Sequence, residues 1–272
     1  MKLGAFFLVL LACATTLAFE VISRKHGNSR IEHGTYVPQG NQKFQVRLGL
    51  GGANCGGSLI DRHWVLTAAH CVSSTPGGWP LDIQSITIKA GSVDLRNQNL
   101  IQERTIKADK DNIIVHEQWA GTDPLCIEQN GVFCDNDIAL IRLRHPYGHG
   151  DIETVEINQN YAKKDLWRIN VTISGWGSTE NEDRTTLLKE AIVQQYHNDE
   201  PKFITLGGPN GESCGGGDSG GPATIDINGK PLLIGVASHG ADIAGGCDYT
   251  NVYYYRDWIE KNIQTHGFSK SL

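Results

Sequence analysis

Three short clusters in the sequence carry side chains that together can activate a nucleophile. WVLTAAHCV holds His70, DNDIALIRL holds Asp137, and GDSGGP holds Ser219. A serine hydroxyl is a poor nucleophile at neutral pH until a base takes its proton. Histidine is the usual base, and a buried aspartate fixes its tautomer. The three residue types therefore predict nucleophilic hydrolysis.

Each cluster also has a structural interpretation. A histidine beside a cysteine is most often structural, an aspartate before an apolar run can cap a strand, and a glycine-rich segment with a serine can be a turn. A lipase-like esterase is a further alternative, because GDSGG fits its GxSxG pattern, but that fold needs the chain order Ser, Asp, His. The order His70, Asp137, Ser219 instead favours a chymotrypsin-type arrangement.

Short apolar or alternating runs must position these clusters. They begin near residue 31 and are separated by Gly, Pro, Asn and Asp; examples are KFQVRLGL, HWVLTAA, SITIKAG, DIALIRL, RINVTISGW, PLLIGVAS and TNVYYY. Many short strands at fairly even spacing indicate an all-β fold of antiparallel barrels or sandwiches. Only the tail YRDWIEKNIQTHG has helical spacing, with Gly267 as its stop.

The overall composition narrows the class of protein. A chain of 272 residues forms one large all-β domain or two small domains. The net charge of -6, without a basic block, gives no reason to expect nucleic acid as a partner. With 32 glycines and 20% charged residues, the chain is typical of a loop-rich globular protein.

The N-terminus has the pattern of an export signal. Lys2 precedes the apolar run LGAFFLVLLACATTLA, and small residues at Thr16 and Ala18 predict a signal peptide over 1–18. The alternative is a membrane anchor, but a span needs about 20 apolar residues. Residues 19–30 are polar and basic, as in a propeptide or linker. We therefore expect a secreted, extracellular protein.

Export changes what the cysteines predict. The chain has seven, and one leaves with the signal peptide; those that remain are Cys55, Cys71, Cys126, Cys134, Cys214 and Cys247. An even number in a secreted chain predicts three disulfides, with fifteen pairings open. A zinc site is disfavoured because no two of these cysteines have a two-residue ligand spacing.

Further motifs, NCGGSLIDRHWVLTAAHC, GSVDL, ISGWG and YTNVYYYRDWI, accompany the three clusters. With them the chain resembles the chymotrypsin/trypsin family of serine proteases over nearly all of residues 31–264. The resemblance implies an all-β fold of two antiparallel six-stranded β-barrels with the catalytic cleft between them. It places the first barrel at about 31–145, the second at about 146–254 and a C-terminal helix at about 255–266, so that 31–272 is the protease domain.

The resemblance also assigns roles. His70 is the general base and acid, Asp137 orients it, and Ser219 forms the acyl-enzyme, while the N–H groups of Gly217 and Ser219 form the oxyanion hole. The family needs no cofactor and no metal ion for this chemistry. We expect protein or peptide substrates, a monomer, and neither nucleic acid nor membrane as a partner.

The segment SRIEHG resembles a zymogen activation site. Cleavage between Arg30 and Ile31 by a trypsin-like protease would create an ammonium group, which in the family is buried beside the aspartate before the nucleophile, here Asp218. A buried carboxylate without a partner is costly, so the pair should order the surrounding loop. The register with Gly34 favours Arg30 over the other basic residues of 19–30.

The family pattern pairs the cysteines as follows: Cys55 with Cys71, Cys214 with Cys247, and, for the remaining two, Cys126 with Cys134. The last pair closes a loop just before Asp137, which either narrows the subsites for substrate or only stabilises an insertion. Two further family bridges are missing, and Thr205 occupies one of their cysteine positions. We expect the wall of the pocket there to be more open.

The specificity pocket departs from the family in spacing. Ser219 follows Cys214 by five residues instead of four, and GDSGGP itself is intact, so the extra residue is one of the glycines at 215 and 216. Counting from the cysteine makes Glu212 the pocket floor, which favours a basic P1 residue. Counting back from the nucleophile makes Ser213 the floor, which favours an apolar one. The sequence favours basic P1, with chymotrypsin-like apolar P1 as the alternative.

The opposite wall of the pocket departs in composition. Ser238 and Gly240 match the family, but His239 replaces a tryptophan that packs under the substrate. Asp242 and Asp248 in this shortened wall add negative charge. The altered pocket leaves one alternative of another class, a catalytically inactive homologue that acts as a binding or regulatory protein.

The sequence also contains one candidate modification site. NVT at Asn170 is a glycosylation sequon that opens an expected strand, so its occupancy is open.

Overall fold

The structure is a computed structural model, and it describes residues 31, 33–73, 84–119, 121, 135–148, 150, 152–177, 185–241 and 245–267. The predicted signal peptide and propeptide lie outside these residues, as do Arg30, Cys126 and Cys134. Among the described residues, no helix is both long enough and apolar enough to span a bilayer.

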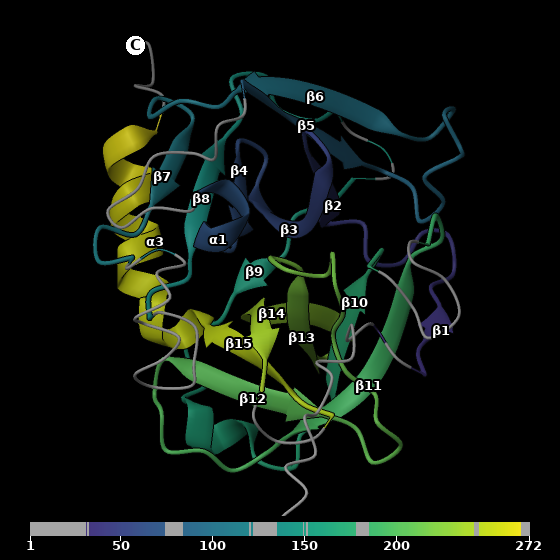
Figure 1. The fold of residues 1–272 in the computed structure, drawn as a ribbon, viewed down its shortest axis with the longest axis vertical. Helices are drawn as coiled ribbons and strands as arrows, with labels where there is room; N and C mark the ends of the chain where they lie inside the picture. Colours follow the sequence, from purple (N-terminus) through teal and green to yellow (C-terminus); the bar gives the residue numbers. More distant parts are fainter. Residues whose placement is uncertain are drawn as a thin grey trace, which may run out of the picture.

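The first half of the chain forms a curled antiparallel sheet in the upper part of Figure 1. Its strand order is β6-β5-β2-β3-β4-β8-β7. The strands are β2 (Gln45–Leu50), β3 (Ala53–Asp61), β4 (Trp64–Thr67), β5 (Ser85–Ala90), β6 (Gln102–Lys107), β7 (Ile113–Val115) and β8 (Ala139–Arg142). Alternate side chains of a strand point to opposite faces of the sheet, and this explains the position of the core. In β5, Ile86, Ile88 and Ala90 are buried, whereas the residues between them are partly exposed.

The second half forms a closed barrel below it (Figure 1). Its elements are β9 (Glu156–Ile157), β10 (Val171–Gly175), β11 (Lys189–Gln195), β12 (Phe203–Gly207), β13 (Pro222–Ile227), β14 (Lys230–Gly240) and β15 (Cys247–Asn251). Pairing of Gln194 with Gly207 joins β11 to β12, so the six strands β10 to β15 close on themselves. The predicted all-β fold is confirmed; the first sheet is a half-barrel rather than a closed six-stranded barrel.

The ends of the chain are exchanged between the two halves. Strand β1 (Thr35–Tyr36) precedes the first sheet in sequence but pairs with β11 of the second. Helix α3 (Val252–His266) follows the second barrel, yet its buried apolar side chains belong to the hydrophobic core of the first sheet. Figure 1 shows α3 running alongside β7 and β8.

Helix α3 begins three residues earlier than the expected start at about 255. The side chain of Asn251 accepts a hydrogen bond from the N–H of Tyr253 at 3.1 Å, and this N-cap starts the helix at Val252. The run TNVYYY is therefore a strand only as far as Asn251, because the cap decides between two conformations that its apolar residues both allow. In the part of the chain that the structure describes there are two shorter helices, α1 (Ala69–Val72) and the 3₁₀ turn η1 (Lys163–Leu166).

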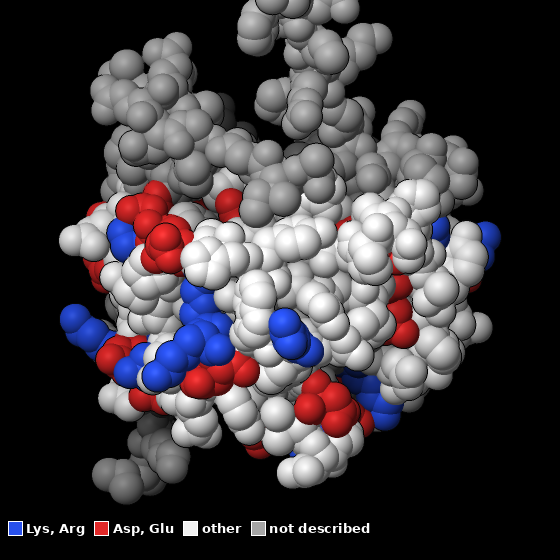
Figure 2. Space-filling model, turned by 90° about the horizontal axis from the view of Figure 1, so that it is seen from below, with Lys and Arg blue, Asp and Glu red and all other residues white. Residues whose placement is uncertain are grey.

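The face of the molecule seen in Figure 2 carries both signs of charge. Lys and Arg side chains alternate with Asp and Glu side chains across it, with uncharged surface between them. The described part of this face therefore forms no extended field of one sign.

Candidate active site

Strand pairing brings His70 and Asp137 together. In the β4–β8 ladder, Thr67 at the end of β4 lies opposite Ala139 at the start of β8. The residues just after β4 and just before β8 must therefore meet at one edge of the sheet. His70 follows β4 in helix α1, and Asp137 precedes β8, so residues 67 positions apart become neighbours.

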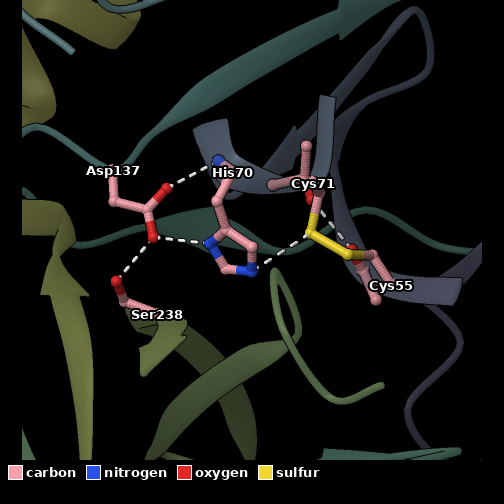
Figure 3. Close-up of a disulfide and its surroundings, with 7 residues drawn as sticks. Cys55, His70, Cys71, Asp137 and Ser238 are labelled. Carbon is pink, nitrogen blue, oxygen red and sulfur yellow. Dashed lines mark hydrogen bonds and ion pairs between the residues drawn. A yellow bond between two sulfur atoms is a disulfide. The ribbon is translucent and has the colours of Figure 1, made fainter. Parts of the chain in front are cut away.

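The contact between the two side chains is a short, doubly anchored pair. Nδ1 of His70 lies 2.8 Å from Oδ2 of Asp137, and the main-chain N–H of His70 donates to Oδ1 at 2.9 Å (Figure 3). The Asp137 side chain is fully buried, and it also accepts a hydrogen bond from Oγ of Ser238. Because a carboxylate only accepts, Nδ1 of His70 carries a proton and Nε2 is left to act as a base.

Burial and charge act against each other on both groups. Burial alone would lower the pKa of His70, but the charge and hydrogen bond of Asp137 raise that pKa above its ordinary value. Burial alone would raise the pKa of Asp137, but the charge and hydrogen bond of His70, with the Ser238 hydroxyl, hold it below its ordinary value. Both directions favour a charged pair once His70 takes a proton.

A disulfide braces the segment that carries the histidine. Cys55 in β3 is bonded to Cys71 in α1, as predicted, and Sγ of Cys71 lies 3.8 Å from Nε2 of His70 (Figure 3). The two sulfurs and the imidazole lie close enough together to resemble a metal site. Sulfurs joined to each other are not thiolates, however, so they cannot serve as ligands of that kind.

The loop that carries Ser219 is pinned between the two halves of the molecule. The carbonyl oxygen of Ser219 accepts from the N–H of Gly56 in β3 at 2.7 Å, and the N–H of Gly220 donates to Ala237 in β14 at 2.7 Å. A Cβ at Gly220 would lie 2.2 Å from Oγ1 of Thr67. The loop therefore packs against Thr67 at the end of β4, three residues before His70. Ser219 itself is half-buried.

The backbone before Ser219 has the form that an anion site needs. Gly217 has φ +97°, a conformation that residues with a side chain rarely adopt. Among the described residues, the N–H groups of Gly217 and Ser219 have no acceptor within the protein. Two unpaired donors in a half-buried loop are available to stabilise a developing negative charge.

Asp218 lies in a buried pocket of main-chain donors. Its carboxylate accepts from the N–H groups of Gly177 at 2.8 Å, Gly215 at 2.8 Å and Ile31 at 3.1 Å. Burial raises the pKa of Asp218 to about 7, although these hydrogen bonds oppose the rise. A Cβ on Gly175 would lie 1.8 Å from Oδ1, so the strand next to the carboxylate has no room for a larger residue.

The two candidates for the pocket floor lie in different surroundings. Glu212 accepts two hydrogen bonds from Asn210, from its main-chain N–H and from its side-chain amide, both at 2.9 Å. These bonds lower the pKa of the partly exposed Glu212 carboxyl. Ser213 is 2% exposed, with Oγ 3.3 Å from Sγ of Cys247. The Glu212 carboxylate is thus held within a turn by Asn210, whereas Ser213 is buried beside the Cys214–Cys247 disulfide.

The two glycines that include the extra residue, Gly215 and Gly216, lie in a turn before Ser219. The N–H of Asp218 donates to the carbonyl of Gly215 at 2.9 Å, while Gly216 at the tip is exposed. The predicted bond between Cys214 and Cys247 is present beside this turn. The disulfide and this turn together hold the segment that leads into GDSGGP.

His239, which stands where the family has a tryptophan, contacts an acidic side chain that the sequence analysis did not connect with it. Its side chain is 3% exposed and lies 3.3 Å, Nε2 to Oδ2, from Asp248. The ring of Phe203 packs edge-on against it, with centroids 5.3 Å apart. Asp248 was expected to add charge to the pocket wall. It also lies beside His239, and only the juxtaposition of β14 and β15 could have revealed this.

Comparisons with known proteins agree with this arrangement. The sequence model of a family described as Trypsin matches residues 31–259. A collagenase of Hypoderma lineatum is 30% identical over 285 residues, which cover 93% of this chain and 95% of that protein. CLIP domain-containing serine protease B4 of Anopheles gambiae is 29% identical, and the match spans 81% of this chain but only 65% of that relative. Neuropsin, a serine protease of mouse brain, aligns with TM-score 0.67 and 28% identity over 85% of this chain and 99% of its own.

Proposed function

Because the chain belongs to the trypsin family of serine proteases, we propose that it is a secreted endopeptidase, made as a zymogen, that cleaves peptide bonds through an acyl-enzyme on Ser219. The observation that carries this proposal is the 2.8 Å pair of His70 with the buried Asp137. A buried carboxylate that fixes the tautomer of a histidine is the arrangement by which that histidine acts as a general base.

The reaction follows from these positions. Nε2 of His70 takes the Ser219 proton as Oγ attacks the peptide carbonyl carbon, and the N–H groups of Gly217 and Ser219 receive the negative oxygen. His70 then gives the proton to the departing amine, and the C–N bond breaks to leave the acyl-enzyme. Water, activated by the same histidine, hydrolyses the ester and restores Ser219. Each oxyanion donor contributes about 2.7–4 kcal/mol to stabilisation of the transition state.

Activation would occur by cleavage after Arg30. The N–H of Ile31 already faces Asp218 at 3.1 Å, in a site where Asp218 is 1% exposed. Cleavage turns this amide into an ammonium, which supplies the positive charge that the buried carboxylate lacks. The geometry thus supports a switch in which cutting the chain stabilises the Ser219 loop.

The surroundings of Glu212 and Ser213 support a small or apolar P1 residue over a basic one. The Glu212 carboxylate is bonded to Asn210 at the surface, whereas Ser213 and the Cys214–Cys247 disulfide lie inside. A basic side chain entering there would lose water without gaining a carboxylate from Glu212, which is costly.

The test uses chain cleaved between Arg30 and Ile31, with Ser219→Ala as the control. Both proteins are exposed to a peptide library containing every P1 residue, and products are identified by mass spectrometry. We expect cleavage that the control lacks, after small or apolar residues. A folded, processed chain that cuts no peptide would favour the inactive binding homologue instead.

A further inference from the structure

A buried polar chain continues beyond the aspartate of the candidate active site. The hydroxyl of Ser238 donates to Oδ2 of Asp137, and Nδ1 of His239 lies 3.0 Å from the same hydroxyl oxygen. A hydroxyl has one proton, and here it goes to a carboxylate that can only accept. The Ser238 oxygen therefore offers only lone pairs to His239, so Nδ1 of His239 must be the donor.

The far side of the His239 ring faces a second acid, which can pair with the ring only when Nε2 carries a proton as well as Nδ1. Nε2 lies 3.3 Å from Oδ2 of Asp248, whose other oxygen accepts a hydrogen bond from Oγ1 of Thr205. Thr205 in turn accepts from the side-chain amide of Asn198. Thr205 stands where the family has a disulfide cysteine, so a polar network replaces a covalent brace at this point.

A break in strand regularity makes this chain of contacts achievable. Successive side chains of a regular strand point to opposite faces, so Ser238 and His239 would not normally touch. The register of β14 against β15 shifts between Ala237 and His239, and beyond the shift His239 lies opposite Asp248. Such irregularities redirect a side chain. Here the result places both side chains in one buried line.

We propose that His239, oriented by Asp248, is a positioning residue of the active site that holds the Ser238 hydroxyl as a donor to Asp137. This role rests on the proposed protease function. Because the His239 side chain is 3% exposed, it acts through Ser238 and not by contact with substrate. The donor at Ser238 fixes Asp137, and Asp137 in turn fixes the tautomer of His70.

Kinetics of processed variants test the proposal. Asparagine places an amide N–H near the position of Nδ1, whereas glutamine places it near Nε2, so His239→Asn should keep the donor and His239→Gln should lose it. We expect His239→Gln to lower kcat about tenfold with KM within about twofold, and His239→Asn to recover most of the loss. Asp248→Asn should cause a smaller drop. His197→Asn is the matched control, because His197 pairs with Asp199 on the exposed surface.

A double-mutant cycle shows whether His239 acts through Ser238. If it does, His239→Gln should lower kcat little further in a Ser238→Ala background. Additive losses, or a rise in KM with unchanged kcat, would overturn the proposal. Thermal unfolding of each variant identifies losses caused by misfolding.

A spectroscopic readout keeps this test independent of activity. In processed Ser219→Ala protein labelled with ¹⁵N-histidine, the Nδ1–H signal of His70 reports its bond to Asp137. We expect His239→Gln to move that signal upfield and speed its exchange, and His239→Asn to restore it. An unchanged signal in both variants would refute the positioning role. Absence of Ser219-dependent cleavage in the wild type would instead refute the protease function alone.

Discussion

The main-chain nitrogen of Ile31 lies 3.1 Å from Oδ2 of Asp218, and both residues are buried. In the uncut chain this nitrogen is an amide, and burial raises the pKa of Asp218 to about 7, above the value of about 3.9 expected when unfolded. The folded chain therefore holds a proton that the unfolded chain releases. The resulting stability is fully present below about pH 4 and is lost as pH rises through about 7.

We predict that cleavage after Arg30 removes this pH dependence, because the new ammonium keeps the Asp218 carboxylate charged. The difference in Tm between cut and uncut protein should grow from pH 4 to pH 7, as measured by calorimetry. Arg30→Gln supplies a chain that a trypsin-like protease cannot cut at this bond. Parallel pH curves for the two forms would contradict the pairing.

The His70–Asp137 pair predicts the acid limb of activity. Asp137 raises the pKa of His70 above its ordinary value, so kcat/KM should fall as pH drops through a midpoint above about 6.5. Asp137→Asn should lower kcat by about 10⁴-fold through the wrong tautomer, and should move the midpoint to lower pH. A pH–rate profile that is flat down to pH 4.5 would exclude His70 as the base.

Comparing two glycines with positive φ distinguishes the effect of backbone strain from the effect of steric crowding. Gly220 has φ +78°, and a Cβ there would lie 2.6 Å from the carbonyl oxygen of Gly56. Gly229 has φ +81° but open space around it. We expect Gly220→Ala to lower the free energy of unfolding by more than about 2 kcal/mol and to abolish cleavage, and Gly229→Ala to cost about 1 kcal/mol with activity kept. Equal effects in urea unfolding would show that crowding at Gly220 is unimportant.

Glu212 should not set the P1 preference. Because its carboxylate is bonded to Asn210, Glu212→Gln should leave the ratio of kcat/KM for lysine and leucine P1 peptides within about twofold of wild type. Ser213→Ala, which alters a buried side chain, should change that ratio. Selective loss of lysine cleavage in Glu212→Gln would return Glu212 to the pocket floor.

Asn170 should carry a glycan when the chain passes through a eukaryotic secretory pathway. Its side chain is exposed and stands one residue before β10, so the fold leaves room for a sugar. We expect a mass shift that is removed by a peptide N-glycosidase. The shift should be absent in Asn170→Gln and in Thr172→Ala, which breaks the sequon. Unmodified wild type from such cells would show that the sequon is not used.

The fold, the His70–Asp137 pair and the two described disulfides could be predicted from the sequence, because each rests on local motifs in a fixed order. The orientation of Glu212 could not be predicted. The inserted glycine leaves it ambiguous, by one residue, which position corresponds to the pocket floor of the family. The contact of His239 with Asp248 could not be predicted either. That contact depends on a shift in strand register, which joins residues nine positions apart in the chain but leaves no periodic signal.

The exchange of chain ends has a consequence for how the protein is made. Side chains of α3, including Tyr255 and Ile259, complete the core of the first sheet, and the Tyr255 hydroxyl donates to Asn136 at 3.0 Å. A ribosome translates these residues after both halves have been synthesised. The N-terminal half must therefore wait with part of its apolar core uncovered, since local burial cannot finish until the last helix emerges.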